Sequence, residues 1–157
     1  MIVRGVSLEK KFHELISDLD ASKGMVFKMI VKQLSVFLEN ASGHFLKLST
    51  CLGKADVNIN ALSLAESAEY GIARMILDDV EKGAAVLSEA GYNVKITNVL
   101  QLSISDTPGS LGTVLVKLAE GNVNVSYIYG YSANGAANLI LRVDDPEHSL
   151  KLLEPCE

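Results

Sequence analysis

Two ten-residue stretches, LSVFLENASG at residues 34–43 and LQLSISDTPG at residues 100–109, decide the fold of this 157-residue chain. Both begin with apolar residues that alternate with others, and both continue into a turn-rich loop that ends in glycine. Alternation with a period of two predicts a half-buried strand, and the loop predicts a break before the next element. Each stretch therefore begins one copy of a repeated unit.

The repeat continues beyond these stretches, because placing position 34 on position 100 aligns 34–87 with 100–153 without a gap. Apolar residues with helical spacing follow each loop, and two further strands come next. Asp79 and Asp145 then stand where a second helix needs an N-cap. The order β-α-β-β-α-β is that of ferredoxin-like folds, in which two helices cover one face of a sheet.

The expected fold class is α+β, with two tandem ferredoxin-like βαββαβ units, the second lacking its last strand, and an N-terminal amphipathic helix. The helix is predicted from Leu8, Phe12, Leu15, Ile16 and Leu19, which share one helical face. We expect three regions, namely an N-terminal extension at 1–28, a first unit at 29–98 and a C-terminally truncated second unit at 99–157.

The second unit is short by one strand, because the alignment of the repeats places that strand at about 159–163 and the chain ends at Glu157. The strand at 100–105 would then have an open edge, which proteins usually cover. We hypothesise that the N-terminal helix or a strand at 25–31 covers it. The extension is otherwise interpreted as sequence upstream of a start at Met29.

Composition excludes several classes of function. The net charge is −5 and there is no basic stripe, so nucleic acid and an anionic membrane are not expected partners. The N-terminus carries charges where a signal peptide needs an apolar segment, so a cytoplasmic location is expected. Cys51 and Cys156 have no ligand-like spacing, and neither a disulfide framework nor a metal site is expected.

The loops at 39–43 and 105–109 are the candidate binding site. Each has Asn or Asp three residues before glycine, directly ahead of a helix. Glycine allows close approach of a ligand, and the first N–H groups of a helix favour an anion such as a carboxylate. The alternative is that these are ordinary turn and cap residues. The candidate ligand-binding residues are Asn40, Ser42, Gly43, His44, Asn58, Asp106, Gly109, Ser110 and Asn124.

Three of these candidates have structural alternatives. Asn58 and Asn124 open the second strand of each repeat, where asparagine also serves in left-handed turns. His44 adjoins the loop and could contact ligand, or could be a solvated residue of the first helical turn. A stripe of tyrosines on one strand face, Tyr127, Tyr129 and Tyr131, indicates a core or interface surface, with a ligand platform as the alternative.

The order of elements, the N/D-x-x-G loop and the VNI or VNV opening of the second strand resemble the ACT domain. The tandem resembles free-standing ACT domain pairs of prokaryotes over about residues 29–157. This resemblance implies a ligand, typically an amino acid, held where two units pair, by this loop and by the second strand of the facing unit. Ser42 stands where many members have proline, as this chain has at Pro108, which implies a looser first loop.

No catalytic residues, cofactor or metal are expected. The three histidines are scattered, and adjacent carboxylates such as Asp78 and Asp79 are better explained by an N-cap than by acid–base chemistry. The leading hypothesis is a regulatory module that binds a small molecule, forms a homodimer and reports to an enzyme encoded elsewhere. The alternatives are a structural oligomerisation module without ligand and, less favoured, a small enzyme.

Overall fold

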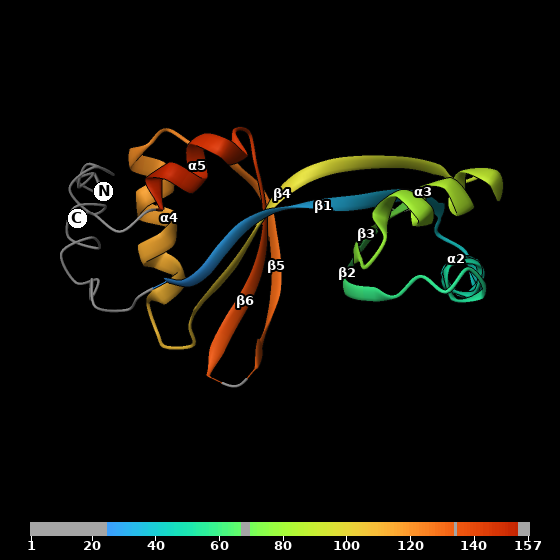
Figure 1. Ribbon diagram of the computed structural model, residues 1–157, viewed down its shortest axis with the longest axis horizontal. Helices are drawn as coiled ribbons and strands as arrows, with labels where there is room; N and C mark the ends of the chain where they lie inside the picture. The colour runs from blue at the N-terminus through green and yellow to red at the C-terminus, as the bar shows by residue number, and fades with distance from the viewer. Residues whose placement is uncertain (1–24, 67–69, 134, 154–157) are drawn as a thin grey trace, which may run out of the picture. The chain divides into compact units, whose positions relative to one another are not determined.

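The computed structural model describes residues 25–66, 70–133 and 135–153 (Figure 1). Its contacts divide the chain into Ile30–Val99, called here the first-repeat unit, and Met1–Met29 with Leu100–Glu157, called the second-repeat unit. The predicted helix over residues 8–19 lies outside the described residues. The elements are β1 (Met25–Glu39), α2 (His44–Lys54), β2 (Ile59–Glu66), β3 (Tyr70–Leu77), α3 (Val80–Glu89), β4 (Asn93–Ser105), α4 (Ser110–Glu120), β5 (Val125–Ala133), β6 (Ala136–Val143) and α5 (Pro146–Leu152).

The repeat predicted from the sequence is confirmed element by element. Helices α2 and α4 begin and end at equivalent positions of the two copies, and so do strands β3 and β6. Even the irregularities repeat, because the pairing register shifts between Ile59 and Ala61 and again between Val125 and Tyr127. The chain is therefore α+β with two copies of one ACT-like unit.

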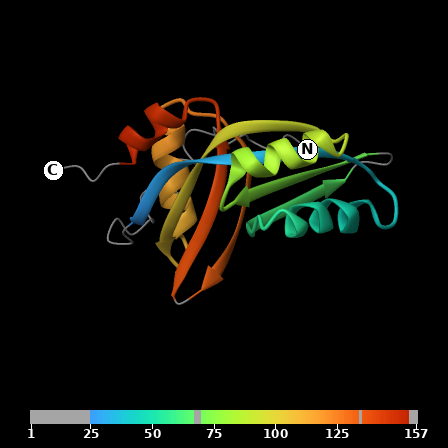
Figure 2. The ribbon, with the colours of Figure 1, turned by 45° about the vertical axis from the view of Figure 1, so that its right-hand side comes forward.

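The first-repeat unit has the strand order β2-β3-β1-β4, with β3 antiparallel to both β1 and β2. Alternate residues of β1, such as Leu34 and Val36, are fully buried and pair across the sheet with Met75 and Ala73. Leu48 and Leu52 of α2 join them in one core with residues of α3. Both helices thus lie on one face of this sheet, as Figure 2 shows.

The second-repeat unit has the order β1-β4-β6-β5, with β6 antiparallel to both β4 and β5. Leu100 and Leu102 of β4 are fully buried, as are Leu141 and Val143 of β6. Helices α4 and α5 cover one face of these strands (Figure 1). The unit therefore repeats the helix-on-sheet layers of the first.

The first residues of β1 supply a fourth strand to the sheet of the second-repeat unit. Residues 25–29 of β1 belong to the second-repeat unit, and β1 is the hydrogen-bonded neighbour of β4. Lys28 reinforces this, because its Nζ donates to the carbonyl of Leu150 in α5 at 2.8 Å. This arrangement agrees with the hypothesis that a strand near residues 25–31 covers the open edge.

Strands β1 and β4 are longer than the sequence pattern predicts. The sequence indicates separate strands before and after residues 97–99, but β4 runs unbroken over 13 residues. Likewise β1 is one strand of 15 residues. Each of these strands contributes one part to each unit, so that Ile30–Val99 is a contiguous βαββαβ unit, whereas the second-repeat unit also includes residues 25–29.

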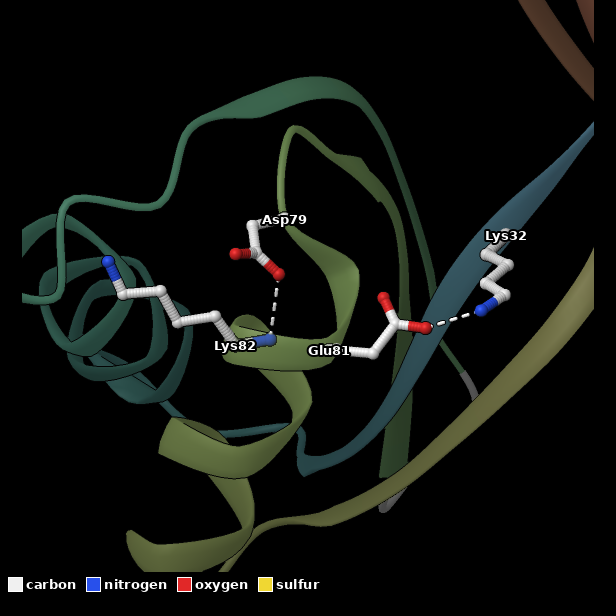
Figure 3. A network of polar contacts seen from close by, with 4 residues as sticks. All are labelled: Lys32, Asp79, Glu81 and Lys82. Carbon is white, nitrogen blue, oxygen red and sulfur yellow. Dashed lines mark hydrogen bonds and ion pairs between the residues drawn. The ribbon is translucent and has the colours of Figure 1, made fainter.

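Side chains cap the second helix of each repeat as predicted. Asp79 accepts a hydrogen bond from the backbone N–H of Lys82 at 3.0 Å, and Asp145 accepts one from His148 at 2.9 Å. Figure 3 shows Asp79 above the first turn of α3, with Glu81 paired to Lys32 of β1. The hydrogen bond from Lys32 is the main cause that lowers the pKa of Glu81 below its ordinary value of 4.5.

Candidate ligand-binding site

The first helix of each repeat begins differently from the second. Gly43 and Gly109 are the N-cap residues of α2 and α4, both in the left-handed region at φ 83° and 90°. No side chain caps either helix, whereas Asp79 and Asp145 cap α3 and α5. Since the first N–H groups of a helix have no partner within it, α2 and α4 present donors that a ligand carboxylate can satisfy.

The loop of residues 39–43 is open. Its residues are exposed, and a Cβ added to Gly43 would meet no heavy atom within 4 Å. The backbone turns tightly, with the N–H of Ala41 on the carbonyl of Glu39 at 2.8 Å and the N–H of His44 on the carbonyl of Ala41 at 3.2 Å. A ligand can therefore approach the glycine backbone without displacing a side chain packed above it.

The loop of residues 105–109 makes a side-chain contact and a backbone contact that fix its position. The hydroxyls of Thr107 and Ser110 lie 2.8 Å apart, and Ser110 is only 3% exposed. The N–H of Asp106 donates to the carbonyl of Gly135 at 3.1 Å, which fastens the loop to the turn before β6. Alanine and histidine stand at the equivalent positions of the first repeat, Ala41 and His44, so that loop has no such hydroxyl pair.

His44 is half-buried beside the first loop. Its Nε2 lies 3.8 Å from a carboxylate oxygen of Glu39, the residue that ends β1. This contact is an ion pair only when the ring is protonated. His44, Asn40, Ser42 and Gly43 therefore lie together at one end of α2, as the sequence predicts.

Asn58 and Asn124 lie away from the loops of their own units. The N–H of Asn58 donates to the carboxylate of Asp78 at 2.9 Å, and its carbonyl accepts from the N–H of Asp78 at 3.2 Å. Asn124 and Asp144 repeat both contacts. These residues mark the Leu77 end of β3, whereas the loop follows Glu39, which pairs with Tyr70 at the other end.

Eight residues of β3 separate these two ends, which is roughly 23 Å at about 3.3 Å per residue. One unit thus does not bring Asn58 and Gly43 together. The interpretation of Asn58 and Asn124 as left-handed turn residues is wrong, because the residues with positive φ are Asp56 and Asn122, two positions earlier.

The adjacent carboxylates have structural roles. Besides its contacts with Asn58, the Asp78 carboxylate accepts from the N–H of Asp79 at 2.8 Å, and Asp79 caps α3. The sequence identifies the cap but misses this second bridge, although the recurrence of Asn58 and Asp78 at equivalent positions of the second repeat was a usable signal. Within residues 25–66, 70–133 and 135–153, no three His, Cys, Asp or Glu residues are grouped to hold a metal ion.

Comparison with known proteins identifies the family. The model of the ACT domain pair matches residues 29–154, so the chain belongs to the ACT domain pair family. Protein BT0572 of Bacteroides thetaiotaomicron is similar, with 36% identity over 80% of this chain and 88% of its own, and a TM-score of 0.77. No curated protein matches the chain.

Two aspartate kinase structures share the fold. The ligand-free regulatory subunit of aspartate kinase from Thermus thermophilus is 12% identical, over 83% of this chain and 97% of its own, with a TM-score of 0.58. Aspartate kinase of Clostridium acetobutylicum is 15% identical, over 83% of this chain but 34% of its own, with a TM-score of 0.55.

None of the described helices is long and apolar enough to cross a membrane.

Proposed function

We propose that this chain is a non-catalytic regulatory module that binds an amino acid at the loop of residues 39–43, where two first-repeat units pair in a homodimer. The observation that carries the proposal is the uncapped start of α2 beneath an exposed left-handed glycine. The ligand carboxylate would take the place that the Asp79 carboxylate occupies on α3. We further propose that the chain regulates an enzyme encoded elsewhere, by analogy with the regulatory subunit of aspartate kinase that shares its fold, and that it does so in the cytoplasm.

The ammonium group of an amino-acid ligand needs partners other than the N-terminus of α2. Asn40 carries both a donor and an acceptor, so its side chain can bind either a carboxylate or an ammonium group. Glu39 and His44 lie beside it, and the Glu39 carboxylate is the natural partner of an ammonium group. This arrangement of donors for a carboxylate next to acceptors for an ammonium group favours an α-amino acid over a simple anion.

The proposed pairing explains why Asn58 lies at the opposite end of its own sheet. Strand β2 is the outermost strand of the first-repeat unit. If the β2 strands of two molecules pair antiparallel, the Asn58 end of one strand meets the Glu66 end of the other. Glu66 pairs with Gly71, beside which β1 ends and the loop begins. Asn58 would therefore complete the site of the partner molecule and not its own.

The surface at this edge supports the pairing. Leu62 and Leu64 of β2 are 42% and 53% exposed, and Leu46 of α2 is 67% exposed. An outer strand with exposed leucines is prone to pair with another strand, and burial of such side chains stabilises the pairing. The same surface favours the second candidate, an oligomerisation module that binds no ligand.

Isothermal titration of the folded full chain with each of the twenty amino acids separates these two candidates. We expect heat from at least one amino acid, and none from the corresponding amine that lacks the carboxylate. Gly43→Val, which cannot adopt the left-handed conformation cheaply, should abolish binding, while Gly53→Ala in the same helix should not. Absence of heat from all twenty, with a dimer still present, would favour the oligomerisation module.

A further inference from the structure

The amphipathic helix that the sequence predicts over residues 8–19 has no part in the proposed amino-acid site. It lies outside the described residues, so its predicted apolar face is known from the sequence alone. The residues of that face are Leu8, Phe12, Leu15, Ile16 and Leu19. A short amphipathic helix is stable in water only when another surface covers its apolar face, so this segment needs a surface on which to pack.

The start of β1 presents two apolar side chains to solvent. Phe27 and Met29 are 48% and 40% exposed. Lys28 between them points toward the helices of the second-repeat unit, because its Nζ donates to the carbonyl of Leu150 in α5. Successive side chains of a strand point to opposite faces, so Phe27 and Met29 lie on the side of the sheet away from α5. This side is called here the helix-free side of the second-repeat sheet.

The neighbouring strands continue the helix-free side. Ser103 of β4 belongs to it, because Ser103 alternates with the buried Leu102 and Ile104. Ser103 pairs with Asn138 of β6, and Asn138 pairs with Tyr131 of β5, which is 59% exposed. The predicted tyrosine stripe is thus on the helix-free side and not in the core. Among the described elements, α4 and α5 both cover the opposite side (Figure 1).

We propose that the N-terminal segment of the same chain docks on the helix-free side, with the apolar face of a helix over residues 8–19 on Phe27 and Met29. The segment leads directly into β1, two residues before Phe27. Residues 20–24 join the helix to the strand, and five extended residues span at most about 18 Å. So short a connection holds the helix at roughly millimolar effective concentration beside this surface, which favours docking within one molecule.

The length and charge of the segment fit this surface better than a lipid surface. A helix over residues 8–19 is about 18 Å long, close to the roughly 20 Å of residues 100–105 in the strand beside β1. Residues 8–20 contain four acidic and two basic side chains, whereas helices that lie on membranes carry mostly Lys and Arg on their polar face. The docking adds no strand pairing, so β1 stays bonded to β4 without it, and amino-acid binding at residues 39–43 does not depend on it.

Tryptophan fluorescence of the full chain tests the docking, because the chain has no tryptophan of its own. Phe12→Trp places a reporter on the predicted apolar face, and we expect acrylamide to quench it at least threefold less in the folded chain than in urea. Ser17→Trp, on the opposite face of the predicted helix, should be quenched nearly as readily as in urea. Phe27→Lys or Met29→Lys, combined with Phe12→Trp, should raise the quenching of the reporter at least twofold.

The matched control is Phe37→Lys, because Phe37 lies on the same strand and is 46% exposed but belongs to the first-repeat unit. It should leave the quenching of the reporter unchanged. Leu15→Trp provides a second reporter if Phe12→Trp does not fold by circular dichroism. Three results would overturn the docking: quenching of the apolar-face reporter as strong as in urea, quenching that neither lysine variant changes, or protection that disappears on dilution, which would place the helix on a second molecule.

Discussion

The first-repeat unit and the second-repeat unit share one order of elements but differ in how they are completed. The first is a contiguous stretch of chain, Ile30–Val99, whose loop at 39–43 is open. The second needs residues 25–29 to complete its sheet, and the hydroxyls of Thr107 and Ser110 are in hydrogen-bond contact at its loop. The repeated scaffold is thus the same in both units, and residues 40–43 and 106–109 are exposed in both loops, while the second loop alone has the hydroxyl contact of Thr107 and Ser110.

The largest expected effect on stability comes from deleting the part of β1, residues 25–29, that belongs to the second-repeat unit. Deletion of residues 1–29 should destabilise that unit by about 3 kcal/mol or more, because the edge of β4 at residues 100–105 loses its neighbour. Hydrogen exchange should show lost protection of amides 100–105, while amides 34–38 keep theirs. Deletion of residues 1–24, which leaves β1 whole, is the control. Protection that survives the longer deletion would contradict the shared strand.

The next largest effect on unfolding free energy distinguishes the two outer strands, β5 and β2. A Cβ on Gly130 of β5 would lie 2.2 Å from the carbonyl oxygen of Asn138, a backbone atom that cannot swing aside. Gly130→Ala should therefore cost about 1–3 kcal/mol in urea unfolding. The equivalent residue of β2 is Leu64, which is half exposed. Gly53→Ala, at a helical glycine with open space, should instead be neutral or stabilising.

The loops should differ in ligand affinity. Asn40→Ala removes a side chain from the open loop and should weaken amino-acid binding about tenfold, which corresponds to about 1.4 kcal/mol. Asp106→Ala, in the second loop, should have a smaller effect, because the proposed site lies at the first loop. Isothermal titration measures both. An affinity unchanged by both substitutions would remove the loops from the binding site.

The caps of α3 and α5 should contribute equally to the free energy of unfolding, although the two loops contribute unequally to ligand binding. Asp79→Ala and Asp145→Ala each remove one acceptor from a helix N-terminus and should each cost about 1 kcal/mol of unfolding free energy. Asparagine at either position keeps an acceptor and should recover most of the loss. Thermal unfolding by circular dichroism checks both pairs. A large cost at one site only would show that the second helices are not equivalent.

The smallest effect concerns Glu81 and Lys32. The pKa of Glu81 is lowered in the folded chain, so its contribution to stability is present above its ordinary value of 4.5 and is lost as pH falls through the folded value. Both side chains are more than half exposed, so solvent screens the pair. Glu81→Gln should change the melting temperature barely at pH 7, and less still as the pH falls through the folded pKa of Glu81. A larger change at pH 3 would contradict this assignment.

Local chemistry made much of this molecule predictable. Helices α2 and α4 follow from their apolar spacing, Asp79 and Asp145 from their cap positions, and Gly43 and Gly109 from the turn before a helix. The continuity of β1 and β4 was not predictable, since the repeat recognised in the sequence begins only at Leu34 and Leu100, after the equivalent residues 27–33 and 93–99 of the two strands. The position of Asn58 at the far end from the loop follows from the sheet register, which one sequence does not contain.

The hydroxyl pair of Thr107 and Ser110 was missed for a related reason. A Ser or Thr three residues from another is common in turns, and only the structure shows that these two hydroxyls are in contact and that Ser110 is buried. The sequence identified both loops and the glycines that begin α2 and α4, but the hydroxyl contact that distinguishes the second loop depends on packing.

The most direct test of the proposed binding site is an amide NMR titration of the full chain with the amino acid that gives the strongest heat. We predict the largest shifts at residues 43–46, where α2 begins without a cap, and at Asn58, with smaller changes at residues 107–111. Shifts confined to residues 107–111, or absent from both loops while heat is still observed, would contradict binding at the open loop.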